Sequence, residues 1–104
     1  MSEAWLDDEV WVVLDSYFAM LDLERQETLY QKMEHRQRVE KMLPGRSAKS
    51  IEFKWCNVSA VLQEAGLPWI PGYKPLAHYQ MRLRELVAIW LLDHQRLSRG
   101  DTAG

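Results

Sequence analysis

The chain has 104 residues and a mass of 12.3 kDa, which suits one domain and is too little for two. Apolar residues make up 47% and charged residues 27%, so the composition excludes global disorder. The single cysteine excludes an internal disulfide and a cysteine-based zinc site, and it suits a reducing compartment. Because the sequence has no apolar run of about 18 residues and no basic leader, we expect a cytoplasmic protein without a membrane partner.

The net charge of −2 hides an uneven distribution along the chain. Residues 1–24 carry seven acidic side chains and no Lys or Arg, whereas residues 25–54 carry eight basic side chains against four acidic ones. A polyanion would therefore be attracted to the middle third of the chain and repelled by the first. The alternative is a solvated helix face whose charges pair with one another.

The first two predicted helices span residues 7–23 and 28–43. Asp7, Asp8 and Glu9 suit a helix N-terminus, and the apolar residues from Val10 onward recur at helical spacing. The second helix has a thinner apolar stripe that begins at Leu29, and it ends where proline and glycine follow at 44–45.

The third predicted helix spans residues 47–65 and the fourth spans 77–97. Ser47 is a good N-cap for the third helix, and Gly66 ends it. This helix has apolar side chains on two faces, so we expect it near the centre of the domain. The sequence thus predicts an all-α, four-helix domain over residues 1–97, followed by a flexible tail at 98–104. The residues expected to share one core are Val10, Tyr17, Trp55, Val58, Leu62, Leu83 and Trp90.

Signatures of catalysis are missing from the sequence. We find no Walker loop, no dinucleotide-binding glycine pattern and no nucleophile elbow. The three histidines lack the spacing of paired metal ligands, and Cys56 has the character of a buried, inert thiol. We therefore expect a protein that is not an enzyme and that has no catalytic residues, metal or cofactor.

The order of the elements matches a helix-turn-helix. An acidic-capped helix leads to a basic helix, a tight Pro-Gly turn and a helix that carries Trp55. In a three-helix helix-turn-helix, the third helix enters the major groove of DNA. The pattern is also similar in shape to Myb-like domains.

Several short motifs resemble one region of a known family. They are Gly45-Arg46-Ser47, Ser50-Ile51-Glu52-Phe53-Lys54, Asn57-Val58-Ser59-Ala60-Val61-Leu62, Gly66-Leu67-Pro68 and Gly72-Tyr73-Lys74-Pro75. Together with Trp5 and the acidic residues after it, they make most of the chain resemble the N-terminal helical domain of bacterial HNH-type endonucleases and related restriction-like multidomain proteins. The resemblance implies an accessory domain for DNA recognition or interference, with the nuclease supplied elsewhere. No HNH motif follows in this chain, and its Trp55-Cys56 is bulkier than the polar pair expected there.

The predicted DNA-binding surface consists of cations that would contact phosphates and of polar residues that would lie near the groove. Its members are Arg36, Arg38, Arg46, Ser47, Lys49, Ser50, Lys54, Asn57 and Lys74. For several of these residues a structural role is the alternative. Arg46 would then bridge to carboxylates of the first helix, Ser47 and Ser50 would only cap, and Asn57 would brace the loop at 66–75.

A second functional hypothesis is a protein-interaction module. The fourth helix has a second apolar group opposite its core stripe, formed by Met81, Ala88, Ile89 and Leu92. Such a patch would serve self-association, or docking on a nuclease or defence complex. The alternative is that this helix packs between the loop and the first helix.

Overall fold

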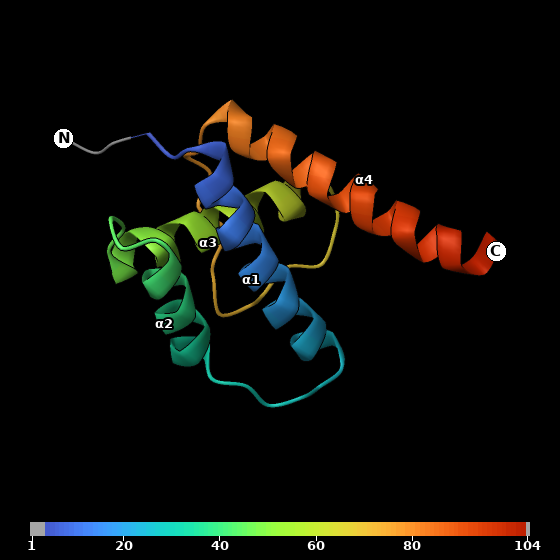
Figure 1. The fold of residues 1–104 in the computed structure, drawn as a ribbon, viewed down its shortest axis with the longest axis horizontal. Coiled ribbons are helices and arrows are strands. Elements are labelled where there is room, and N and C mark those ends of the chain that lie inside the picture. The colour runs from blue at the N-terminus through green and yellow to red at the C-terminus, as the bar shows by residue number, and fades with distance from the viewer. Residues whose placement is uncertain (1–3, 104) are drawn as a thin grey trace.

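The computed structural model describes the backbone of residues 4–103 and the side chains of residues 4–94. Four helices, α1 (Asp7–Arg25), α2 (Lys32–Met42), α3 (Ala48–Glu64) and α4 (Met81–Ala103), make up the fold (Figure 1). None of the described residues lies in a strand, so the all-α prediction is confirmed. No helix among them has the length and apolar character required to cross a membrane.

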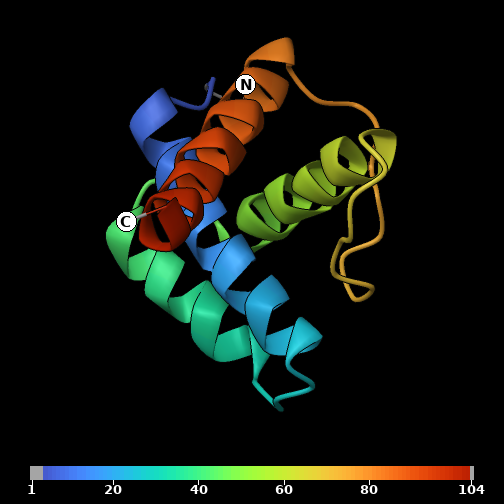
Figure 2. The ribbon, with the colours of Figure 1, turned by 90° about the vertical axis from the view of Figure 1, so that its right-hand side faces the viewer.

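The third helix lies in the interior of the fold together with α1, as the two apolar faces of the third helix predicted. Both α1 and α3 pack against each of the other three helices. Figure 2 shows α1 and α4 on one side of α3 and the segment 65–80 on the other. A helix enclosed in this way can present little of its length to a partner.

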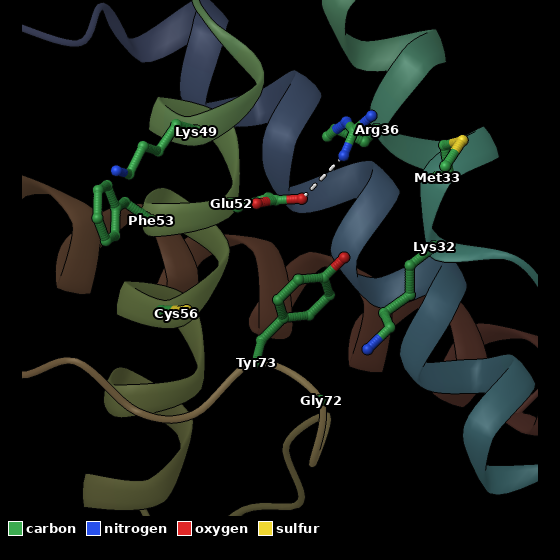
Figure 3. Close-up of a pocket in the computed structure, with 9 residues that line it drawn as sticks. All are labelled: Lys32, Met33, Arg36, Lys49, Glu52, Phe53, Cys56, Gly72 and Tyr73. Atoms are coloured by element: carbon green, nitrogen blue, oxygen red, sulfur yellow. Dashed lines mark hydrogen bonds and ion pairs between the residues drawn. The ribbon is translucent and has the colours of Figure 1, made fainter.

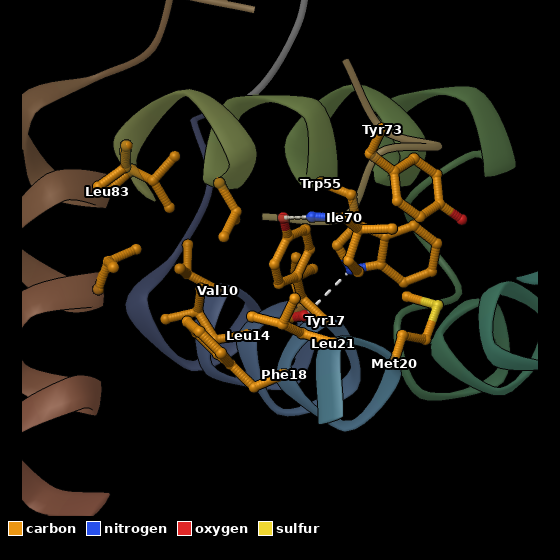
Figure 4. Close-up of a cluster of buried hydrophobic side chains, with 14 of the residues drawn as sticks. Val10, Leu14, Tyr17, Phe18, Met20, Leu21, Trp55, Ile70, Tyr73 and Leu83 are labelled. Carbon is orange, nitrogen blue, oxygen red and sulfur yellow. Dashed lines mark hydrogen bonds between the residues drawn. The ribbon is translucent and has the colours of Figure 1, made fainter. Parts of the chain in front are cut away.

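The core is an apolar cluster whose polar atoms are paired (Figure 4). The hydroxyl of Tyr17 accepts a hydrogen bond from the backbone N–H of Ile70 at 3.0 Å and shares another with Ser59 Oγ at 2.7 Å. The indole N–H of Trp55 donates to the carbonyl of Val13 at 3.1 Å. These bonds tie α1, α3 and the segment 65–80 together, and they remove the cost of burying unpaired polar groups.

Six of the seven predicted core residues are buried, and Trp90 lies at the edge of the core. The indole of Trp90 stacks on Phe18 at a centroid distance of 4.0 Å, and its N–H donates to Asp15 at 3.0 Å. An indole whose polar end reaches a surface carboxylate remains half-buried because that end stays close to water.

Two helix boundaries differ clearly from the prediction. The second helix begins at Lys32 rather than at 28. Glu27, with a left-handed φ of 55°, belongs to the turn that ends α1, and residues 28–31 then form a non-helical connection up to the extended N-cap Gln31. Leu29, predicted on its apolar stripe, is 98% exposed in this connection. The fourth helix begins at Met81 rather than at 77 and continues beyond 97 to Ala103. The first and third helices deviate by two residues or fewer at each end.

The segment 65–80 is held across the outer side of α3 by Asn57. The carboxamide nitrogen of Asn57 donates to the carbonyls of Leu76 at 2.7 Å and His78 at 3.1 Å. The backbone N–H of Leu76 donates in turn to the carbonyl of Cys56 at 3.1 Å. The segment therefore covers the C-terminal half of α3 and leaves its first turns open. It also explains the late start of α4, because residues 76–78 are engaged with α3.

Replacing Trp55 with Ala should lower the free energy of unfolding by about 3–5 kcal/mol, because it removes a fully buried indole and leaves a cavity. Phe53 lies on the same helix and is 50% exposed, so Phe53→Ala should cost less than about 1 kcal/mol. Urea unfolding followed by circular dichroism measures both changes. Equal losses in the two variants would contradict the orientation of α3.

Candidate nucleic-acid interface

The first turns of α3 face solvent, as do Gln63 and Glu64 at its C-terminal end. Ser47, Lys49 and Phe53 are exposed and Ser50 is half-exposed; we call these four residues the open face of α3. Ser47 Oγ accepts from the backbone N–H of Ser50 at 3.1 Å, and Ser50 Oγ donates to the carbonyl of Ser47 at 2.9 Å. Ser47 thus caps the helix, as its structural alternative proposed, whereas the Ser50 hydroxyl only bonds back to the Ser47 carbonyl. Both serines also lie on the accessible side of the helix.

Arg46 has a structural role at the start of α3. Its guanidinium donates to both carboxylate oxygens of Glu9, at 3.1 and 2.7 Å, and to the carbonyl of Ala4 at 2.8 Å. Hydrogen bonds from Arg46 hold the pKa of Glu9 below its ordinary value. Because its side chain is only 11% exposed, Arg46 fastens residues 4–9 to α3 and has little surface left for DNA.

A hollow of about 620 Å³ lies between the N-terminal residues 4–5, α3 and the segment 77–80. One wall consists of Arg46, just before α3, and of Ser50, Lys54 and Asn57 on α3, which are four of the nine residues predicted to bind DNA. We call it the Lys54 hollow. Of Arg46 and Lys54, which both line it, Lys54 forms no ion pair with a carboxylate of the described residues. Burial lowers the pKa of Lys54, with a further contribution from the nearby charge of Arg46.

A second hollow, of about 390 Å³, lies between α2, α3 and the loop at Gly72 and Tyr73 (Figure 3). We call it the Tyr73 hollow. Its cations are Lys32, Arg36 and Lys49. Arg36 pairs with Glu52 and Glu40, each at 3.1 Å, so its charge is largely compensated. The exposed residues Lys49 and Phe53 belong to the open face of α3 and line this hollow as well.

Three lysines around the open face of α3 share one feature. Their ammonium groups lie over aromatic rings: Lys32 over Tyr73 at 5.2 Å from the ring centroid, Lys49 over Phe53 at 5.9 Å and Lys54 over Trp5 at 5.0 Å. None of the three forms an ion pair with a carboxylate in the described part of the chain. Ring contacts hold these charges in place without neutralising them. We call these residues the three lysines.

The other predicted site residues lie apart from this group. Asn57 is buried and holds the segment 65–80, which is the role given by its structural alternative. Arg38 is exposed beside His35, in a separate hollow between α1 and α2. Lys74 is exposed on the loop and lines neither of the hollows that flank α3. The predicted partner surface, Met81, Ala88, Ile89 and Leu92, is exposed on α4.

Lys32 and Trp5 belong to this surface, yet the sequence did not indicate them. Their partners are distant in sequence, because Lys32 meets Tyr73 and Trp5 meets Lys54. The unusual number of tryptophans was the available signal, but it does not tell which ring meets which cation.

No protein-family model, no characterised protein and no solved structure matches this chain.

The pairing of Glu9 with Arg46 predicts a specific acid dependence. Because the folded pKa of Glu9 lies below 4.5, the stabilisation from this pair is complete above about pH 4.5 and is lost as the pH falls through the lowered value. Glu9→Gln should therefore show a shallower fall in stability with acid than the unaltered protein. Urea unfolding across a pH series measures this, with Asp8→Asn as the control from the same helical turn. Identical acid limbs for Glu9→Gln and the unaltered protein would contradict the pairing.

Proposed function

We propose that this chain is a non-catalytic module that binds DNA through the open face of α3. The observation that supports the proposal is the gathering of the three lysines, whose charges no described carboxylate pairs with, around the accessible turns of α3. The resemblance of the sequence to the N-terminal domain of HNH-type endonucleases supports a restriction or defence context for this binding. The catalytic part would be supplied by another domain or chain.

The arrangement fits the way in which a recognition helix meets a duplex. In helix-turn-helix proteins the N-terminal residues of that helix approach the bases, while cations beside it contact phosphates. Here Lys49 and Ser50 project from the first turn of α3, with Lys32 on the α2 side and Lys54 on the other. Most of the C-terminal half of α3 is covered, and the exposed residues at its end, Gln63 and Glu64, carry no cation, which favours contact through the first turns.

Arg46 is a poor probe of DNA contact, because its removal would also break the bonds to Glu9 and Ala4. A hydrogen bond to a charged group contributes about 1.5–3 kcal/mol, so Arg46→Ala should destabilise the fold. Lys32 and Lys49 are exposed and free of ion pairs with described carboxylates, so their removal tests binding without that complication.

Lys32→Ala combined with Lys49→Ala should weaken binding to duplex DNA and reduce the slope of log affinity against log salt by about two. The physical reason is that each lost phosphate contact no longer releases condensed counterions. Fluorescence anisotropy of a labelled duplex over a salt series gives the slope.

The control is Arg25→Ala combined with Lys41→Ala, which removes the same charge from exposed positions outside the open face. This variant should keep the slope of the unaltered protein. The proposal fails if the unaltered protein does not bind at low salt, or if both double variants lose the same slope.

A second candidate function is self-association through α4. Met81, Ile89 and Leu92 are 64%, 41% and 57% exposed on one helix, which extends beyond the body of the domain (Figure 1). Exposed apolar residues at helical spacing are typical of surfaces that pair with another helix. A second copy of the chain is the partner that this hypothesis names.

If α4 mediates self-association, sedimentation should show a species heavier than 12.3 kDa that Leu92→Glu returns to monomer. Leu67→Glu makes the same chemical change at a 39% exposed position outside α4 and should leave the larger species intact. A protein that is monomeric at every accessible concentration would exclude this candidate.

A further inference from the structure

The ammonium group of Lys54 opens into the Lys54 hollow, and its contact there is the ring of Trp5, 5.0 Å from the centroid. The residue is 7% exposed, and its Nζ forms no hydrogen bond or ion pair with any described residue. Every fully buried side-chain nitrogen or oxygen in the described part of the chain has a partner. An unpartnered Nζ therefore cannot be sealed in the core, and it reaches the space of the hollow that it lines.

The chemistry of the walls leaves this charge uncompensated. No Asp or Glu is among the described residues that line the hollow. Arg46 brings a second cation, over the same Trp5 ring at 4.4 Å, but its charge is paired with Glu9, which does not line the hollow. Asn57 is occupied with the carbonyls of Leu76 and His78. A largely desolvated cation without a counter-charge is unfavourable, so an anion from outside the chain would be bound favourably here.

The space and the walls restrict the class of anion. A hollow of about 620 Å³ is within the range of ordinary ligand sites and is far larger than one bound water needs. Trp5 contributes an aromatic wall, and Ser50, a member of the open face of α3, lines the hollow as well. A tetrahedral oxyanion on a larger molecule fits this combination, because its charge meets Lys54 while the remainder extends over the open face.

We propose that the Lys54 hollow binds one phosphate group, with Lys54 Nζ as its anchor and Trp5 as its wall. The assignment of that phosphate to the DNA backbone rests on the proposed function. A free phosphate or phosphate monoester would meet the same chemistry, so the experiment separates these sources.

The first arm uses inorganic phosphate and the unaltered protein. In a nuclear magnetic resonance titration, phosphate should shift the indole N–H of Trp5 and the backbone amides of 77–80 in a saturable way, relative to chloride at matched ionic strength. This measurement needs no variant. Absence of saturable shifts at these positions would overturn the proposal of a phosphate site.

The second arm compares Lys54→Met with Lys41→Met, which removes an exposed lysine outside the hollow. Phosphate salts stabilise folded proteins in general, and this rise in Tm should be the same in all three proteins. Binding in the hollow should raise the Tm of the unaltered protein and of Lys41→Met further than that of Lys54→Met. Without phosphate, Lys54→Met should melt at the same or a higher temperature than the unaltered protein, because an uncompensated charge is gone. Equal phosphate responses in the three proteins would overturn the role of Lys54.

The third arm uses labelled duplex DNA. Lys54→Met should reduce the salt slope of duplex binding by about one, whereas Lys41→Met should not. Duplex binding with an unchanged slope in Lys54→Met overturns the backbone assignment and leaves the open face of α3 as the DNA site. Saturable phosphate shifts without duplex binding overturn the DNA function and support a site for a free phosphate or monoester.

Discussion

The hydrogen bonds from the carboxamide of Asn57 to the segment 65–80 decide which part of α3 can meet a partner. They hold an extended stretch of chain across the outer side of a helix whose inner side already packs on α1. Tyr17 anchors the beginning of the same segment through Ile70. Because the segment is fixed at these points, the accessible residues of α3 lie in its first turns and at its last two positions, Gln63 and Glu64. The unpaired cations lie around the first turns.

The cations near these turns fall into two groups with different physical roles. Arg36 of α2 pairs with Glu52 of α3, and Arg46, just before α3, pairs with Glu9 of α1. The charges of both arginines are therefore largely compensated within the molecule. The three lysines lie on aromatic rings instead. A ring positions an ammonium group without cancelling its charge, whereas a carboxylate positions the group and also cancels its charge. An overall net charge of −2 conceals this local excess, which is why total charge was a poor guide to the surface.

Local signals in the sequence predicted the helices well. The start of α2 and the approach of Lys32 to Tyr73 were not predicted, and the latter depends on tertiary contacts. The acidic first turn of α1 and the cap at Ser47 depend on neighbouring residues, so both helices were predicted nearly to their ends. Glu27 adopts a left-handed conformation at a position where the sequence has no glycine, and the non-helical residues 28–31 follow it. The start of α2 was therefore predicted too early. At the site, Lys49 and Ser50 were identified from their place at the start of a helix. The approach of Lys32 to Tyr73 could not be foreseen, because it depends on how the loop packs.

The proposed contact between DNA and the open face of α3 can be mapped on the amide spectrum of the full chain. On addition of a short duplex, the largest shifts should cluster at residues 47–53, near Lys32 and along 77–80, which border this face and its two hollows. Shifts gathered on the exposed side of α4 around Ile89 and Leu92, with residues 47–53 unaffected, would contradict the account.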